Sequence, residues 1–232
     1  MIDWHTHVLP RVDDGSESVE QSIEMLNALA EQGVDCVIAT PHFYVDDESV
    51  DQFLARRDES YSRLMESLGD GAPRILCGAE VRYYPGISKL EGLTKLKIGS
   101  TDFLMIEMPM SKWTEYTVRE LVAIASRGKI KLIIAHIERY YSLQDESVWR
   151  RLYESGALMQ VNASFFDRLA TRRKALKMLK RGGISFIGSD CHNMTSRAPN
   201  LSGAYALIEK KLGREYVYRM IKYGYDMLNI SI

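Results

Sequence analysis

The stretch VDCVIAT, residues 34–40, decides the fold: it is an apolar run of strand length, and Pro41 ends it. Upstream of it, Ser18–Gln32 carries apolar residues at helical spacing and opens with a capping pair. Met1–His5 is another short, mostly apolar run that we interpret as a strand. A strand, a helix and a strand in this order predict a βαβ unit whose two strands are parallel.

The same alternation continues along the chain. We expect further strands at Arg74–Val81, Phe103–Glu107, Lys131–Ala135, Leu158–Asn162 and Ile184–Gly188. We expect helices at Asp47–Leu68, Thr114–Arg127, Glu146–Glu154 and Asp167–Arg181, and in most of the chain after the last strand. This pattern predicts one α/β domain over residues 1–232 with seven strands in a barrel, and a doubly wound open sheet is the alternative. The long connection Tyr83–Thr101 is typical of a functional or partly ordered segment.

The composition is that of an ordinary globular protein, with 46% hydrophobic residues, 26% charged residues and a net charge of -1. This balance gives no reason to expect a nucleic acid as partner. No run of 18 apolar residues occurs, so we expect no membrane insertion, and the first residues lack the features of a signal peptide. Cys36, Cys77 and Cys191 are odd in number and widely spaced, which favours reduced thiols in a cytoplasmic protein.

All five histidines of the protein fall at the carboxyl ends of expected strands. His5 and His7 end the first strand, His42 follows the second, His136 the fifth and His192 the seventh. In parallel α/β folds this edge of the sheet carries the functional site. One histidine at a strand end is more often a hydrogen-bonded structural residue, but five at the same edge favour a metal site.

Carboxylates lie at the same edge. Glu80 stands inside an apolar strand, and Glu107 and Asp190 end two others. A carboxylate in a buried strand is costly unless it is paired or bound to a metal. Asp13 and Asp14 follow the first strand, although Asp-Asp-Gly is also an ordinary turn sequence. With Asp14 included, nine residues are candidate ligands, enough for two or three divalent ions.

Several motifs together resemble the PHP (polymerase and histidinol phosphatase) family. They are Asp3-Trp4-His5-Thr6-His7, Asp13-Asp14-Gly15, Ala39-Thr40-Pro41-His42, Gly78-Ala79-Glu80, Ile106-Glu107-Met108-Pro109, Ala135-His136-Ile137-Glu138-Arg139 and Ser189-Asp190-Cys191-His192. Their order and spacing resemble most the manganese-dependent protein-tyrosine phosphatases of capsular and exopolysaccharide operons in Gram-positive bacteria. The resemblance covers nearly the whole chain, and it implies a distorted, seven-stranded TIM-like barrel of PHP type.

The resemblance also implies a ligand set for three metals. His5 and His7 would bind the first metal with Glu80 and Asp190. Glu80 would bridge to a second metal, which Glu107 and His136 also bind, and the third would be held by Asp14, His42 and His192. The implied ions are Mn²⁺, with iron, zinc or magnesium as alternatives. Arg139 and Arg197 would bind phosphate.

The function implied is hydrolysis of phosphotyrosine by a hydroxide that bridges two metals. The substrate would be a protein, namely the tail of a bacterial tyrosine kinase that regulates polysaccharide synthesis. Other PHP activities are alternatives, such as histidinol-phosphate hydrolysis or phosphodiester cleavage. A non-catalytic metal-binding module is a third, less favoured reading, because such a module would be expected to have lost ligands.

Two further features have more than one interpretation. Residues Cys191–Arg197 match C-x5-R, the pattern of cysteine-dependent tyrosine phosphatases, but the five residues between them contain no glycine for the tight phosphate loop. The helix Asp167–Arg181 is strongly basic. Such a helix is more often a solvated surface, and the functional interpretation is a rim that steers phosphorylated, acidic peptides.

Overall fold

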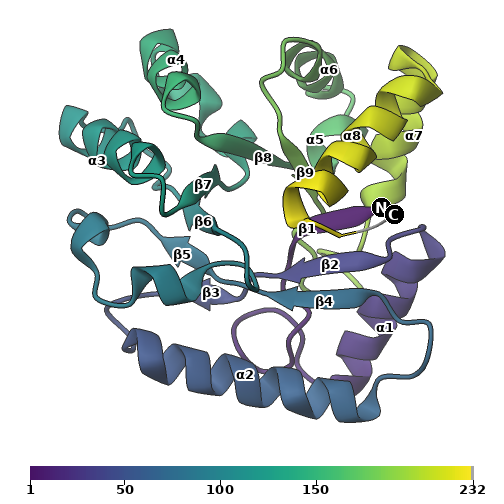
Figure 1. The fold of residues 1–232 in the computed structure, drawn as a ribbon. Helices are drawn as coiled ribbons and strands as arrows, with labels where there is room; N and C mark the ends of the chain where they lie inside the picture. The colour runs from purple at the N-terminus through teal and green to yellow at the C-terminus, as the bar shows by residue number, and fades with distance from the viewer. Residues whose placement is uncertain (231–232) are drawn as a thin grey trace.

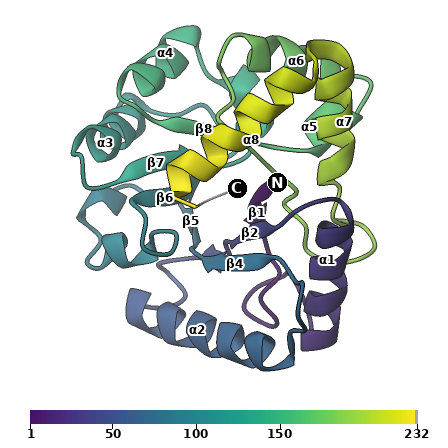
Figure 2. The same ribbon diagram turned by 45° about the vertical axis from the view of Figure 1, so that its right-hand side comes forward.

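A curled sheet of parallel strands lies at the centre of the molecule, and helices cover its outside (Figures 1 and 2). The computed structural model describes residues 1–230. The strands are β1 (Ile2–Thr6), β2 (Cys36–Ala39), β3 (His42–Phe43), β4 (Arg74–Cys77), β5 (Glu80–Arg82), β6 (Phe103–Glu107), β7 (Lys131–Ile134), β8 (Leu158–Asn162) and β9 (Phe186–Gly188). The helices are α1 (Val19–Glu31), α2 (Val50–Ser67), α3 (Glu115–Ser126), α4 (Glu146–Glu154), α5 (Ser164–Asp167), α6 (Arg172–Lys180), α7 (Leu201–Leu212) and α8 (Arg214–Leu228). Short 3-10 helices are η1 (Ile87–Lys89), η2 (Leu93–Leu96), η3 (Ile137–Arg139) and η4 (Tyr141–Leu143).

The sheet closes on itself as a barrel. Its hydrogen-bonded order is β1-β2-β4 in one part and β3-β5-β6-β7-β8-β9 in the other. β2 continues into β3, and β4 into β5, so that each pair forms one interrupted strand of the barrel. A parallel bridge between Thr6 and Cys191 joins the end of β9 to β1. The predicted barrel is therefore confirmed, and the doubly wound alternative is wrong.

The strand expected over Arg74–Val81 is interrupted, which the sequence pattern did not indicate. The interruption lies at Gly78, where an added Cβ would be 2.8 Å from Ile98 Cγ1. Hydrogen bonds still cross this point, because Gly78 N donates to Ala39 O at 2.8 Å and Glu80 N donates to Pro41 O at 3.0 Å. The two-residue strand β3 was also not predicted.

The helix expected over Asp167–Arg181 is wrong at its start. Asp167 ends the separate one-turn helix α5, and α6 begins only at Arg172. The reason is local: Phe165 and Phe166 are buried and hold α5 against the core. The backbone is then extended at Arg168 before the second helix begins. The long connection Tyr83–Thr101 contains η1 and η2.

One end of the barrel is closed by α8. Tyr225 and Leu228 of α8 belong to the apolar cluster that includes Trp4 and Phe186. The rings of Trp4 and Phe186 stack with their centroids 3.6 Å apart. This packing fills the barrel from the end where the strands begin, so an open site can form only at the opposite end.

None of the helices in residues 1–230 combines the length and the apolar character needed to cross a membrane.

The substitution Gly188→Ala is expected to destabilise the protein by about 1–3 kcal/mol, because the added Cβ overfills a packed interior. The added atom would lie 2.5 Å from His5 Cβ and 2.7 Å from His5 N. Urea denaturation measures the loss. Gly69→Ala is the matched control, since nothing lies within 4 Å of its added Cβ. Equal unfolding midpoints for the two variants would contradict the close approach of β9 to β1.

Candidate metal centre

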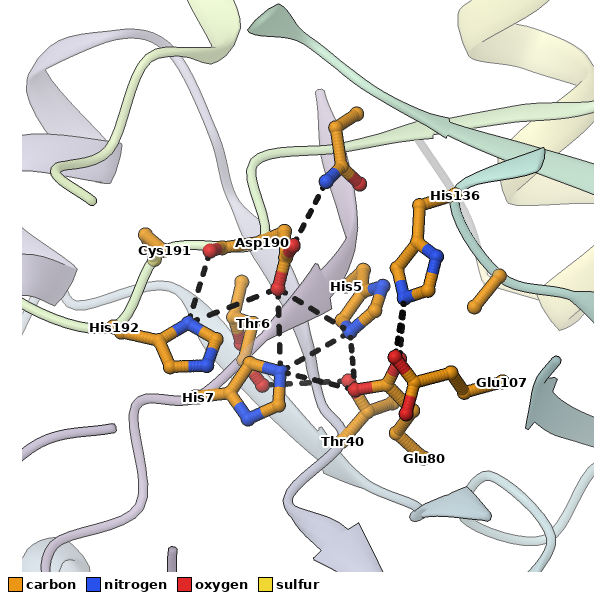
Figure 3. A network of polar contacts seen from close by, with 12 residues as sticks. His5, Thr6, His7, Thr40, Glu80, Glu107, His136, Asp190, Cys191 and His192 are labelled. Carbon is orange, nitrogen blue, oxygen red and sulfur yellow. Dashed lines mark hydrogen bonds and ion pairs between the residues drawn. The ribbon is translucent and has the colours of Figure 1, made fainter. Parts of the chain in front are cut away.

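The histidines gather at the end of the barrel where the strands finish, and Figure 3 shows four of them. The Nε2 atoms of His5 and His7 are 3.1 Å apart. Backbone bonds between β1 and the end of β9 fix both residues: Asp190 N donates to His5 O at 2.8 Å, and His7 N donates to Cys191 O at 3.0 Å. Imidazole nitrogens that face each other this closely need a proton or a cation between them.

The structure brings together all nine residues that the sequence selected as candidate ligands. Their donor atoms form four overlapping groups, and the atoms of each group lie within 4.8 Å of one another. The groups are His7, Asp14, His42 and His192; His5, His7 and Asp190; His5, Glu80 and His136; and His42, Glu80 and Glu107.

Glu80 occupies the centre of this cluster. Its Oε2 lies 3.1 Å from His5 Nε2 and 3.1 Å from His42 Nδ1, and its Oε1 lies 2.7 Å from His136 Nε2. The residue begins β5, directly after the interruption of the strand, and is only 1% exposed. A carboxylate so deeply buried requires positive charge around it.

Asp190 connects the cluster to both candidate arginines. It lies two residues after β9 and has a left-handed backbone (φ 55°), and its Oδ1 lies 3.4 Å from His7 Nε2. Arg197 Nη2 donates to the same Oδ1 at 2.8 Å, and Arg139 Nη2 donates to the other oxygen, Oδ2. Both guanidinium groups are about one third exposed, at 35% and 37%, so they border the cluster on its solvent side.

The buried carboxylates create a strongly negative environment. Burial alone would raise the pKa of Glu80, but His5 and the hydrogen bonds from neighbouring histidines hold it well below its usual range. Burial alone would lower the pKa of His5, yet the carboxylates of Glu80 and Asp190 raise it. The pKa of His7 is also raised, chiefly because Asp13 outweighs the effect of burial. Positive charge is therefore favoured around His5 and His7, whereas burial lowers the pKa of His136 and His192.

The residues present fit a cluster of divalent cations. His42 Nδ1 and His192 Nε2 are buried and face carboxylate oxygens of Glu80 and Asp14 at 3.1 and 3.4 Å, but neither nitrogen forms a hydrogen bond within residues 1–230. Leaving such atoms without a partner is costly, and a cation would satisfy both nitrogens. The mixture of imidazole and carboxylate donors suits manganese, iron and zinc better than calcium.

The structure distinguishes the two adjacent aspartates, which the sequence could not. Asp14 is exposed, and its Oδ1 lies 3.4 Å from His42 Nε2 and 3.4 Å from His192 Nε2. Asp13 is nearly buried instead; its Oδ2 accepts from His7 Nδ1 at 2.6 Å and from the backbone N of His42 at 2.9 Å. Asp13 thereby turns the Nε2 atom of His7 toward the cluster, a role that oxygen partners of metal-binding histidines commonly have.

Two polar residues of β8 were missed by the sequence reasoning. The amide oxygen of Gln160 accepts from the backbone N of His136 at 2.5 Å, and Asn162 Nδ2 donates to Asp190 Oδ2 at 2.8 Å. A signal was present, because these two polar residues alternate in the otherwise apolar strand LMQVN. Both side chains orient residues of the cluster from the interior of the barrel.

The thiol of Cys191 is poorly suited to act as a nucleophile. Cys191 is fully buried, and burial raises the pKa of its thiol to about 12. A thiolate is the reactive form of cysteine, and it is scarce at neutral pH with such a pKa. The geometry thus argues against the cysteine-dependent interpretation of Cys191–Arg197.

Comparisons with known proteins find relatives along nearly the whole chain. The sequence matches the family model "Capsular polysaccharide synthesis, CpsB/CapC" over residues 1–227. It is 31% identical over 229 residues to the tyrosine-protein phosphatase YwqE of Bacillus subtilis, with 95% of this chain and 88% of YwqE covered. It is also 31% identical over 229 residues to the tyrosine-protein phosphatase CpsB of Streptococcus pneumoniae, with 92% and 91% covered.

Solved structures show the same architecture. One of them belongs to a set of crystal structures of YwqE and CpsB, which are described as "unique metal-dependent tyrosine phosphatases". It superposes with a TM-score of 0.83 at 27% identity, and the superposition covers 100% of this chain and 96% of the other. Histidinol phosphate phosphatase from Lactococcus lactis shares the fold, with a TM-score of 0.58 at 17% identity and coverage of 90% and 92%. Because the family model spans nearly all of the sequence, the chain belongs to the CpsB/CapC family of capsular polysaccharide synthesis proteins.

Proposed function

We propose that this protein is a metal-dependent protein-tyrosine phosphatase, which hydrolyses the phosphate ester of phosphotyrosine in a protein substrate. The observation that carries the proposal is that nine histidine and carboxylate side chains able to bind metal lie close together, beside two partly exposed guanidinium groups. The names of the relatives, YwqE and CpsB, support tyrosine phosphate as the substrate.

We assign the ligands in three sets, for two to three ions that we expect to be Mn²⁺, with iron, zinc or magnesium as alternatives. His5, His7, Glu80 and Asp190 form the first set, Glu80, Glu107 and His136 the second, and Asp14, His42 and His192 the third. The overlap of the observed donor groups at Glu80 supports its role as a ligand shared between two sets.

The bound cations would supply an acidified water as nucleophile and would polarise the phosphoryl group. Arg139 and Arg197 act on the substrate itself. Each carries a planar pair of N–H donors, which suits the oxygens of a phosphoryl group. Asp190 orients both guanidinium groups toward the same place, so they stabilise the charge that develops on the phosphoryl oxygens during transfer.

The partner we propose is a phosphorylated bacterial tyrosine kinase whose tail carries the phosphotyrosine. The family's connection to capsular polysaccharide synthesis supports it. We also propose a cytoplasmic location. Cys36, Cys77 and Cys191 are all free thiols, which is the ordinary state of cysteine in that compartment.

A substrate panel with metal analysis on the same sample tests the proposed function. A phosphotyrosine peptide, histidinol phosphate and a bis-aryl phosphodiester are each assayed with added Mn²⁺. We expect the peptide to be hydrolysed with the highest kcat/KM and the sample to contain two to three ions per chain. A preference for histidinol phosphate or the diester would point to another PHP activity. Less than one ion per chain after loading would support the non-catalytic module.

Asp13→Asn is expected to weaken metal binding by about 10–100-fold, because the residue orients a ligand without binding the metal. The carboxylate that holds His7 Nδ1 at 2.6 Å loses its charge, so the ring is held less firmly. Calorimetric titration with Mn²⁺ measures the change. Asp47→Asn serves as the control, since Asp47 is exposed in the loop after β3 and outside the donor groups. Equal affinities of both variants would contradict the role of Asp13.

A further inference from the structure

A strongly basic surface lies on the side of the barrel and takes no part in the proposed chemistry. We call it the α6 basic face, and its seven residues, all exposed, are Arg168, Arg172, Arg173, Lys174, Lys177, Lys180 and Arg181. Asp167 is the one acidic residue in this stretch. None of the seven forms an ion pair with a carboxylate within residues 1–230, whereas elsewhere Arg151 pairs with Glu115 and Lys222 with Asp226. The positive charge of this face is therefore not neutralised by the protein itself.

The arrangement of these charges is unfavourable for the helix that carries them. The first turn of α6 contains Arg172, Arg173 and Lys174 and no acidic residue. The amino end of a helix carries partial positive charge, so cations there are destabilising. Arg173 and Lys177 also lie four residues apart, a spacing at which like charges repel. Local rules of helix stability are broken in this way mostly where a function requires it.

The basic face borders a groove between α4 and α6 with a volume of about 870 Å³. Four cations line it, Arg150, Lys174, Lys177 and Arg181, together with the aromatic residues Tyr141, Trp149 and Tyr153 and the acids Glu146 and Glu154. Lys174 Nζ lies 4.9 Å from the centroid of the Tyr141 ring. A recess with aromatic walls and an excess of cations suits an extended acidic chain.

The groove is connected to the candidate metal centre through neighbouring segments of the chain. α4 and α6 lie on either side of β8 (Figure 1), and Asn162 at the end of β8 contacts Asp190. Tyr141, which lines the groove, follows the phosphate-binding candidate Arg139 by two residues. A polypeptide with one residue in the centre can therefore continue over this rim into the groove.

We propose that the groove between α4 and α6 binds an acidic segment of the polypeptide that carries the phosphotyrosine, outside the catalytic centre. This inference rests on the proposed phosphatase function. A membrane surface fits less well, because the cations border a recess between two helices. A nucleic acid fits less well, because the chain as a whole has a net charge of -1. Charge complementarity also raises the rate of encounter with an acidic substrate.

Kinetics on matched substrates test the proposal. The groove variant is Lys174→Glu/Lys177→Glu, and the control is Lys210→Glu/Lys211→Glu, which makes the same change of charge at exposed positions of α7. On a phosphotyrosine peptide with an acidic flank, the groove variant is expected to lose about tenfold in kcat/KM, and added salt to reduce the advantage of the wild type. On the same peptide with a neutral flank and on para-nitrophenyl phosphate, all three proteins should be alike. Equal losses in both variants would show a general effect of charge and overturn the proposal.

A binding measurement separates the groove from the catalytic function. A fluorescent acidic peptide without tyrosine should bind the wild type and the α7 control, and should bind the groove variant at least about tenfold more weakly. The groove variant should unfold close to the temperature of the wild type, because the favourable carboxylate at position 174, in the first turn of α6, is offset by the unfavourable one at position 177, in its last turn. Lack of para-nitrophenyl phosphate hydrolysis would refute the phosphatase function, whereas equal peptide binding by all three proteins would refute the groove alone. Binding to phosphatidylglycerol vesicles and to RNA is measured in the same way. If the groove variant loses binding only to the vesicles or only to RNA, and keeps binding to the peptide, the proposal is also overturned.

Discussion

Glu80→Gln is expected to lower kcat/KM on a phosphotyrosine peptide by about 10³-fold or more, because a ligand shared by two metal sets supports the electrostatics of the whole reaction. Its carboxylate contacts ring nitrogens from His5, His42 and His136, which come from three different places in the barrel. Glutamine keeps the shape of the side chain but removes its charge. Metal content, measured on the same sample, should fall by at least one ion per chain.

Glu120→Gln is the matched control for this variant. Glu120 is also a nearly buried glutamate, but it lies on α3 and accepts hydrogen bonds from Tyr83, Gly86 and Ser88, outside the cluster. Its replacement should leave metal content unchanged. Circular dichroism establishes that both variants fold. A folded Glu80→Gln protein with full metal content and wild-type activity would disprove the assignment of Glu80.

Removal of divalent ions by a chelator is expected to abolish activity, and Mn²⁺ is expected to restore it. The reason is that, without bound ions, nothing in the site lowers the pKa of a water molecule enough to make it a nucleophile at neutral pH. Thermal stability gives a second, independent measurement. Binding to the folded state alone stabilises it by about 2.7 kcal/mol at a ligand concentration 100 times Kd, so the melting temperature should rise as Mn²⁺ is added.

Cys191→Ser distinguishes metal chemistry from thiol chemistry in the same assay. If the metal centre performs the reaction, the serine variant keeps most of its activity and still loses it with chelator. Activity that survives chelation but disappears in the serine variant would instead establish Cys191 as the nucleophile, despite its burial.

Much of the fold and of the site could be predicted from the sequence because the signals are local. The strands Phe103–Glu107 and Leu158–Asn162 and the helix Glu146–Glu154 have the predicted bounds, since each is a continuous apolar or amphipathic run. The gathering of the nine candidate ligands follows from a simple rule: parallel strands finish at the same edge. Residues far apart in the sequence could thus be placed together without knowledge of their contacts.

What could not be predicted depends on contacts between distant segments. The interruption lies at Gly78, whose backbone is closely approached by Ile98, twenty residues later. Asp13 and Asp14 are chemically identical neighbours, and only the path of the loop decides which one is buried against His7. The start of α6 was misplaced because the burial of Phe165 and Phe166 outweighs helical propensity in the residues that follow.

The closure of the barrel has a consequence for how the protein is made. Ser189 N donates to Asp3 Oδ1 across a separation of 186 residues, at the point where β9 meets β1. His5 and His7 therefore leave the ribosome long before Asp190 and His192 are synthesised. Contacts of such long range form late and slowly during folding. The nascent chain can acquire the complete set of candidate ligands only after the segment that follows β9 has been added, so the proposed activity cannot arise before His192 has been synthesised.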